Sequence, residues 1–426
     1  MREPLLEKPQ MSLARLLCLF SGWLVVLVAF LGWGTIPVCA QPETRAEEID
    51  LARRDKKARL WPERQNQMVE LLNKWVERGL LDEAGTGKGS NGPQIVFGGM
   101  RSGHGLSVGV GYRRSDWWRE QLDFRFAGRG TIQKAYMFDL GLDFPKLQGR
   151  RSFLEFRTKW ENSPQMDYFG PGPSSREEDR TSYRLEDVAV DLRGGTKIAG
   201  PLKGGGTFGF LAVNTGPGRR SGVPSTDEIF DSTTTPGLDA QTRFLRGGAF
   251  LQFDWRDHPL GPRTGGNYLI RFTQYFDRKL NAHDFGQLDL VAEQYFPYFN
   301  KARVIALRLA AVMTFTRGSN TVPFYLQPTL GGNKTLRGFP IGRFTDESTI
   351  MATVEHRWHV FSALDAALFF DLGKVAPKIG LLNFDELEYG GGLGLRFKVR
   401  DAVVLRIDQA VSREGYRVML TFSNVF

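Results

Sequence analysis

Hydrophobic and polar residues alternate in many short runs along most of this chain. In the last run, YRVMLTFSNVF, the apolar residues Tyr416, Val418, Leu420 and Phe422 share one face. Successive side chains of a β-strand point to opposite faces, so the alternation predicts a strand with one apolar side. About sixteen to seventeen such runs, separated by Gly, Pro, Asn and Asp clusters, lie between Gln94 and Phe426.

The length of these runs and the polar faces opposite the apolar ones indicate a membrane barrel. A tilted transmembrane strand needs about 9–11 residues, and the clearest runs reach that length. Charges lie in mid-strand on the polar faces: Arg271, Arg308, Glu355, Asp371, Arg396, Arg406 and Asp408. A wet lumen tolerates such charges, and a bilayer excludes open sheet edges.

The predicted fold class is therefore all-β, a transmembrane antiparallel β-barrel of about 16 strands over residues 94–426. Aromatic residues such as Phe276, Phe296 and Trp358 lie on the apolar faces, as expected for the girdles at the two lipid interfaces. A secreted all-β protein, in which the apolar faces form a core, is the alternative.

The first 93 residues follow a different pattern. Residues 1–40 contain an apolar run that ends in IPVCAQ, which predicts a secretory signal peptide cleaved after Ala40. An uncleaved membrane anchor is the alternative, and Met11 is a second candidate for the start. Residues 41–93 are rich in charge, and we expect a short periplasmic helical segment and a Gly/Ser linker. A disordered tail is the alternative for this segment.

Composition narrows these hypotheses further. Hydrophobic residues make up 41% of the chain and the mean hydropathy is −0.29, which excludes a membrane protein with many spanning helices. The two cysteines, Cys18 and Cys39, both fall in the predicted leader, so no disulfide framework is expected. The net charge of +9 suits an anionic lipid surface and is no evidence for nucleic-acid binding.

Sequence patterns typical of catalysis are weak. GTGKGS lacks the spacing of a phosphate-binding loop, and G-x-S-x-G does not occur. His356 and His359 would point to opposite faces of one strand, which makes them a poor metal pair. We predict no catalytic residues, cofactor or metal site.

Two motifs carry a family resemblance. They are LGGNKTLRGF, which contains Arg337, Gly338 and Phe339, and FFDLG, from Phe369 to Gly373. Together with the terminal aromatic strand, they resemble the C-terminal barrel of the BamA/TamA outer-membrane assembly factors, or bacterial surface antigen proteins. The resemblance covers roughly residues 94–426 and is most specific over 253–426. Residues 41–93 are too few for the POTRA modules of well-studied members, so the likeness is to the barrel alone.

The resemblance implies that the loop carrying Arg337 folds into the barrel. Strand alternation places Asp371 and Glu355 on the lumen face. The glycines let the loop turn inward, and the planar Arg337 guanidinium suits a carboxylate. We therefore expect Asp371, with Glu355 as second acceptor, to hold Arg337. A solvated loop arginine is the alternative.

The resemblance also implies a function and a location. It indicates a bacterial outer-membrane protein that assists insertion or translocation of polypeptides, with a C-terminal assembly signal at Tyr416, Phe422 and Phe426. Its implied partners are outer-membrane lipid and polypeptide substrates or periplasmic modules. A passive channel or structural barrel without insertase activity is the alternative function.

Overall fold

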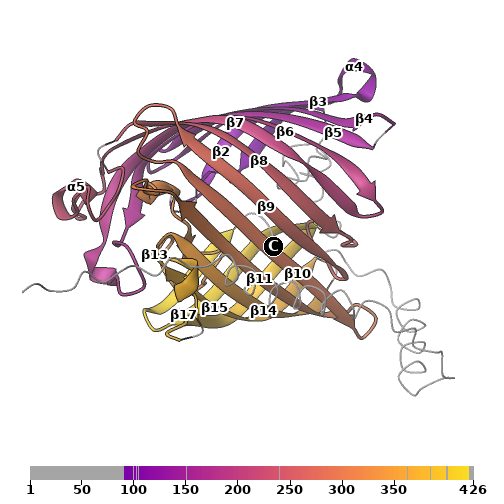
Figure 1. Cartoon of the computed structure of the whole chain (residues 1–426). Helices are drawn as coiled ribbons and strands as arrows, with labels where there is room; N and C mark the ends of the chain where they lie inside the picture. The colour runs from indigo at the N-terminus through magenta and orange to yellow at the C-terminus, as the bar shows by residue number, and fades with distance from the viewer. Residues whose placement is uncertain are drawn as a thin grey trace, which may run out of the picture. The chain divides into compact units, whose positions relative to one another are not determined.

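A single large antiparallel sheet dominates the structure (Figure 1). The computed structural model describes residues 91–98, 100–101, 103, 105–149, 151–238, 240–361, 363–383, 385–399 and 402–421. The sheet has 16 strands, and their spatial order follows the chain from β1 to β18, with the small β12–β13 pair set apart. The predicted all-β barrel and its strand number are confirmed.

The elements have the following bounds. The sheet consists of β1 (Gly92–Phe97), β2 (Ser107–Asp116), β3 (Leu122–Thr131), β4 (Tyr136–Leu147), β5 (Ser152–Tyr168), β6 (Thr181–Ala199), β7 (Leu202–Pro217), β8 (Thr242–Asp254), β9 (Gly265–Asp277), β10 (Phe285–Tyr298), β11 (Arg303–Thr316), β14 (Ser348–Phe361), β15 (Leu364–Ala376), β16 (Glu388–Val399), β17 (Ala402–Ser412) and β18 (Gly415–Thr421). The smaller elements are α4 (Trp117–Glu120), η1 (Glu177–Asp179), α5 (Thr226–Ile229), η2 (Phe324–Leu326), β12 (Thr329–Leu330), β13 (Phe344–Thr345) and η3 (Ile379–Leu381).

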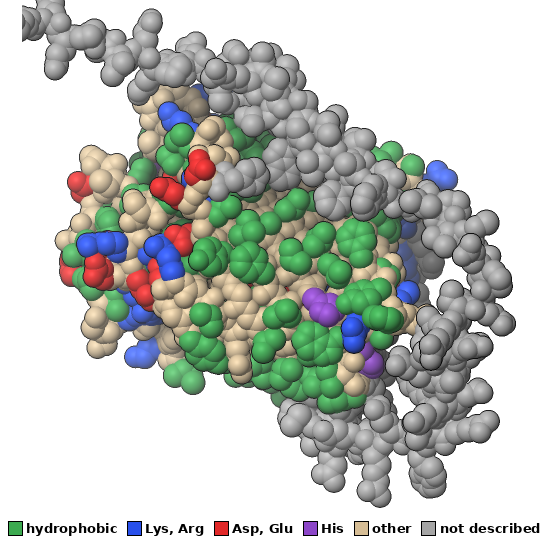
Figure 2. Space-filling view, turned by 90° about the horizontal axis from the view of Figure 1, so that it is seen from below, with side chains coloured by type: hydrophobic (Ala, Val, Ile, Leu, Met, Phe, Trp, Pro, Cys, Tyr) green, Lys and Arg blue, Asp and Glu red, His purple; other side chains and the backbone are tan. Residues whose placement is uncertain are grey.

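The strand register sorts the side chains as the alternation predicts. Glu355 pairs with Phe369 across β14 and β15, and Thr353 pairs with Asp371. These four side chains are buried on the inner face, whereas Val354 and its neighbours on the outer face are exposed. Figure 2 shows a broad outer surface covered mainly by hydrophobic side chains. A lipid-facing exterior and a polar interior follow from this division.

Ion pairs line much of the inner face. Cross-strand examples are Arg157 Nη2 to Asp143 Oδ1 at 2.9 Å, Arg246 Nη2 to Asp191 Oδ2 at 2.6 Å and Arg271 Nε to Asp289 Oδ2 at 3.1 Å. The first and third pairs join neighbouring strands and stabilise their register modestly, whereas Arg246 of β8 reaches across β7 to Asp191 of β6.

The two ends of the sheet differ in their connections. Long loops at one end include residues 169–180, 218–241 and 317–347, whereas turns such as 200–201 and 299–302 close the other end. Apolar side chains from the two longest loops join inward strand residues in one buried cluster, which includes Leu238, Phe244 and Phe324. Short turns face the periplasm in barrels of this class, so the long-loop end is extracellular.

Several predicted features lie outside the described residues. These are the signal peptide at 1–40, nearly all of the helical segment and linker at 41–93, and the terminal aromatics Phe422 and Phe426. Within the described part of the chain, no helix has the length and hydrophobicity needed to cross a bilayer.

Candidate functional site

The loop between β11 and β14 folds back against the inner face of the sheet. Gly331, Gly332 and Gly338 have φ angles of +115°, +91° and +97°, in the left-handed region that favours glycine. A Cβ on Gly331 would lie 2.2 Å from the carbonyl oxygen of Pro340. These glycines therefore permit the tight course that carries Arg337 inward.

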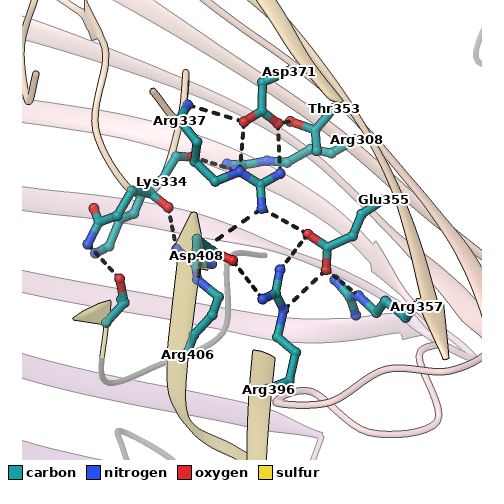
Figure 3. A network of polar contacts seen from close by, with 12 residues as sticks. Arg308, Lys334, Arg337, Thr353, Glu355, Arg357, Asp371, Arg396, Arg406 and Asp408 are labelled. Carbon is teal, nitrogen blue, oxygen red and sulfur yellow. Dashed lines mark hydrogen bonds and ion pairs between the residues drawn. The ribbon is translucent and has the colours of Figure 1, made fainter. Parts of the chain in front are cut away.

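Arg337 is fully buried, with 0% of its surface exposed, and it meets two carboxylates (Figure 3). Its Nε donates to Asp371 Oδ2 at 2.7 Å and its Nη2 donates to Asp371 Oδ1 at 2.8 Å. Nη1 donates to Glu355 Oε2 at 2.9 Å, and the Arg337 backbone N–H also donates to Asp371. The guanidinium carbon lies 3.5 Å from the centre of the Phe369 ring. A two-pronged ion pair with an aromatic face beneath it holds the loop in position.

Both acceptors are themselves held by neighbours. Thr353 Oγ1 donates to Asp371 Oδ1 at 2.8 Å. Glu355 accepts from Arg357 Nε at 2.7 Å and from Arg396 Nη2 at 2.9 Å. Thr353 therefore holds one oxygen of Asp371, and Arg357 and Arg396 hold Glu355, so strand residues as well as Arg337 orient the two carboxylates.

Asp408 extends the network to β17. It accepts from Arg396 Nη1 at 2.7 Å, and its other oxygen lies 2.6 Å from Arg406 Nε. Arg406 also donates to the carbonyl of Asn333 in the loop. The network thus joins four buried arginines to three buried carboxylates: Arg337, Arg357, Arg396, Arg406, Glu355, Asp371 and Asp408.

Apolar packing supports the loop beside this network. Phe339 is buried with Leu330, Leu336 and Phe344, and the rings of Phe339 and Phe344 are 5.2 Å apart. The Gly338 carbonyl accepts a hydrogen bond from Ser412 Oγ at 2.9 Å. The Arg-Gly-Phe motif therefore combines a charge anchor, a tight turn and an apolar anchor.

Glycines on the facing strands make room for the loop. A Cβ on Gly390 of β16 would lie 2.2 Å from the carbonyl oxygen of Arg337. A Cβ on Gly394 would lie 2.2 Å from both Arg396 Nη1 and Asp408 Oδ1. Gly373, predicted as part of the strand motif, would bring a Cβ to 3.0 Å from Leu330 Cδ1. We did not predict roles for Gly390 and Gly394, although every second residue of YGGGLGLRF from Gly390 to Gly394 is glycine.

Arg343 forms a second anchor that the sequence analysis missed. Its side chain is buried, and its Nε donates to Glu414 Oε1 at 2.8 Å in the β17–β18 turn. Its Nη1 and Nη2 donate to the hydroxyl and carbonyl oxygens of Ser175 in the β5–β6 loop, at 2.8 and 2.6 Å. One loop side chain thereby links two other extracellular connections. Nothing in the sequence around Arg343 indicates which distant residues it will bind.

The β8–β9 turn carries a third set of contacts, at the periplasmic end. Arg263 Nη2 donates to Asp365 Oδ2 at 2.8 Å, and the Val403 backbone N–H donates to the carbonyl of Leu260 at 3.2 Å. The Pro262 carbonyl accepts a long bond of 3.5 Å from Arg357, the arginine that also binds Glu355. The turn therefore reaches strands β15 and β17 and touches the edge of the Arg337 network.

Asp346 is a buried acid at the extracellular end of the same loop. Burial raises the pKa of Asp346 to about 6. Burial also raises the pKa of the adjacent Glu347, and the Asp346 charge adds to that effect. The loop thus contains a carboxyl group that gains a proton under mildly acidic conditions.

Of the predicted C-terminal residues, only Tyr416 is described. Its side chain is 59% exposed on the outer face of β18, opposite the inward Arg417. This position suits contact with lipid. Its role as an assembly signal, shared with Phe422 and Phe426, remains a prediction.

Comparison with known proteins agrees with this architecture. A family model described as the Omp85 superfamily domain matches residues 101–416. BamA from Haemophilus ducreyi lacking POTRA domains 1–3 is similar in structure, with a TM-score of 0.58 and 16% sequence identity, covering 79% of this chain and 69% of that chain. CdiB from Escherichia coli matches with a TM-score of 0.49 and 13% identity, covering 78% of this chain and 60% of that chain. No curated protein sequence is significantly similar.

Solved structures at such low sequence identity show that the fold is shared and nothing more. The match to the family model shows which family the chain belongs to. Its match spans most of the chain and includes both the Arg-Gly-Phe loop and the Phe369–Gly373 strand. This chain therefore belongs to the Omp85 superfamily and is a β-barrel protein of the bacterial outer membrane.

Proposed function

We propose that this protein assists the insertion or translocation of polypeptides at the outer membrane, without enzymatic chemistry. The observation that carries the proposal is the burial of Arg337 between Asp371, Glu355 and Phe369. The protein's own loop occupies part of the lumen and is pinned there by ionic contacts. A loop held there narrows the space open to solutes, which disfavours a wide, steadily open pore.

The edges of the sheet supply the surface on which a substrate strand would act. Strands β1 and β18 stand at the two ends of the strand order. Strand β1 has 6 residues, compared with 17 in β5 and 19 in β6. A short seam between the first and last strands would separate more readily than the long pairings elsewhere, and a free strand edge templates pairing with another chain.

In this proposal the Arg337 network keeps the C-terminal strands in one arrangement while the seam opens. Its members come from the loop, β14, β15, β16 and β17, and β17 is the immediate neighbour of β18. Lipid of the outer membrane and periplasmic modules are the proposed partners, alongside the polypeptide itself.

A passive channel is the second candidate function. The observation in its favour is a polar cavity of about 370 Å³ on the inner face, lined by Arg157, Asp191, Arg246 and Arg271 among others. Water and ions fit such a space, and ion pairs of this kind line the lumen of channels.

Two measurements on the full chain distinguish the candidates. In planar bilayers we expect small, flickering currents, and in vesicles we expect faster insertion of an unfolded test barrel than in vesicles lacking the protein. Arg337→Ala should reduce the acceleration, whereas Arg271→Ala, which alters a half-exposed lumen arginine, should leave it unchanged. Large steady currents without any acceleration would establish the passive channel instead.

A further inference from the structure

A group of aromatic and basic side chains lies on the outer face of the barrel at its short-turn end. We call it the girdle cluster, and it consists of Tyr298, Phe299, Lys301, Arg303, His356 and Trp358. It comes from the ends of β10, β11 and β14 and from the turn between β10 and β11. Figure 2 shows histidine and basic side chains among hydrophobic ones toward one end of the visible face.

The strand register brings these residues together. Tyr298 pairs with Arg303, and Arg303 pairs with Trp358. Ile305, two residues along β11, pairs with His356. Alternation places all of them on the same side as the exposed Ile305, the side that faces lipid.

Arg303 is an exposed arginine on this lipid-facing side. Its guanidinium carbon lies 5.1 Å from the centre of the Phe299 ring. Within the described part of the chain, no carboxylate lies at ion-pair distance from Arg303, whereas inward arginines such as Arg246 and Arg396 bind carboxylates closely. A cation at the membrane interface with only a ring beside it is available to an external anion.

His356 offers a second polar group. The Tyr298 hydroxyl and His356 Nε2 are hydrogen-bonded, and their rings stack with centres 5.8 Å apart. This bond orients the imidazole. When the Tyr298 hydroxyl is the donor in it, Nδ1 carries the ring proton and can donate to another partner. The Trp358 ring is a further neighbour of the imidazole, with centres 5.5 Å apart.

The turn that carries Phe299 and Lys301 is strained. Phe299, Asn300 and Lys301 have φ angles of +48°, +52° and +62°, and only asparagine among them tolerates this region well. Strain of this kind persists where the surroundings impose it, often at binding sites. Lys301 is exposed at the rim, and its Nζ is 3.8 Å from Asp257, a loose pairing.

We propose that the girdle cluster binds the headgroup phosphate of an anionic phospholipid in the periplasmic leaflet. Arg303 and Lys301 supply positive charge, His356 Nδ1 supplies a directed hydrogen bond, and the aromatic rings pack against the glycerol and upper acyl region. In a zwitterionic lipid the headgroup amine offsets the phosphate charge, so an anionic lipid binds better. The inference rests on membrane location and holds whether or not the barrel inserts polypeptides.

The test uses the purified full chain in detergent, incubated with phosphatidylglycerol or phosphatidylcholine of identical acyl chains and examined by native mass spectrometry. Wild type should retain phosphatidylglycerol about fivefold more than phosphatidylcholine, the preference that one basic residue near a headgroup supplies. Arg303→Gln should bring the ratio close to one, and His356→Phe should reduce it in part. Arg151→Gln, at an exposed arginine of the β4–β5 turn, should leave the ratio unchanged.

Equal retention of the two lipids by wild type would overturn the proposal. An equal loss in Arg303→Gln and Arg151→Gln would also overturn it, because net charge alone would then explain the preference. If Arg303→Gln gives no heat-shifted folded band on a gel, His356→Phe decides: a reduced ratio supports the site and an unchanged ratio refutes it.

Discussion

Arg337 loses all contact with solvent and is compensated by two carboxylates and an aromatic face. Removing a partner of such a residue lowers the stability of the fold strongly, because the remaining charge stays buried. An ion pair whose side chains are exposed to solvent contributes little to that stability. The inner face of this barrel contains both kinds, which permits matched experiments.

The first prediction concerns the Arg337–Asp371 pair. Arg337→Ala and Asp371→Ala should each lower the free energy of unfolding by about 3–5 kcal/mol, because each leaves the other charge buried without its two-pronged partner. Arg337 keeps Glu355 in the second variant, so the loss there should lie at the lower end of that range. The double variant should lose less than the sum of the two, since the second change removes a charge that already lacks its partner. Urea unfolding followed by tryptophan fluorescence measures all three values.

Arg271→Ala serves as the control for this cycle. The Arg271 side chain is 47% exposed, so its pair with Asp289 should contribute at most about 1 kcal/mol. Strictly additive losses for Arg337 and Asp371 would show that the two side chains are not coupled and would remove the basis for a pinned loop.

The second prediction concerns space on β16. Gly390→Ala should destabilise the loop by about 1–3 kcal/mol, because the added methyl group collides with the Arg337 carbonyl. Gly391→Ala on the same strand should be tolerated, since its nearest neighbours would be 3.4 Å away. Trypsin cleavage in the loop, at Lys334 or Arg337, reports the difference. Similar cleavage of the two variants would contradict the steric account.

At the scale of elements, the β11–β14 loop acts as a connector. Arg337 attaches it to β14 and β15, and Arg343 attaches it to the β5–β6 loop and the β17–β18 turn. The β8–β9 turn makes a separate set of contacts at the other end of the lumen. Connections that look independent along the chain are therefore joined through the interior.

The third prediction concerns the pH dependence of this loop. Burial raises the pKa of Asp346 to about 6 from a usual value of 3.8. The folded loop therefore favours the protonated acid, so its stability is greatest below about pH 4 and falls as the pH rises through about 6. The loss should be on the order of 2 kcal/mol.

Protease sensitivity of the loop measures this effect. Wild type should be cleaved faster at pH 7.5 than at pH 4.5, after correction for the protease's own pH profile with an unfolded substrate. Asp346→Asn should remove most of the difference. An equal pH dependence in the variant would assign the effect to another group.

The fourth prediction tests the course of the β8–β9 turn. A Leu260→Cys/Val403→Cys variant should form a disulfide under mild oxidation, because the backbone groups of the two residues are hydrogen-bonded at 3.2 Å. The only native cysteines, Cys18 and Cys39, lie in the predicted leader. A pair with Lys203→Cys in place of Leu260→Cys should stay reduced, and failure of the first pair to cross-link would place the turn elsewhere.

At the scale of the whole molecule, the 16-stranded sheet needs both its ends in place. The final strand carries an outward Tyr416, and the predicted assembly signal continues to Phe422 and Phe426. Aromatic side chains near the two ends of a membrane strand anchor it at the two lipid interfaces.

The fifth prediction rests on the sequence, in which the apolar alternation of the terminal run ends at Phe426. Phe426→Ala should lower the amount of folded protein in the outer membrane several-fold, because the terminal strand loses its anchor and is slower to join the sheet. Ile198→Ala, at an exposed residue near the β6–β7 turn, is the matched control. Immunoblots with and without heating separate folded from unfolded protein, and equal folded levels in both variants would argue against an assembly signal.

The sequence alone determined the fold class, the strand number and the division between outer and inner faces. Each alternating run is recognised from its own residues, and counting the runs gives the strand number. Alternation is therefore a local property of the chain. The proximity of Arg337 to Asp371 and Glu355 was also expected, because strand parity aims both carboxylates inward and the family resemblance implied that the Gly-rich loop folds into the barrel.

Only the tertiary structure decided the rest of the site. Arg396, Arg406 and Asp408 were expected on the inner face, but nothing in their spacing shows that they join the Arg337 network. Arg343 is far along the chain from its partners Ser175 and Glu414, and Leu260 is far from Val403. These contacts depend on how the curved sheet and its loops meet across the lumen, and local alternation of residues carries no information about which distant side chains will meet there.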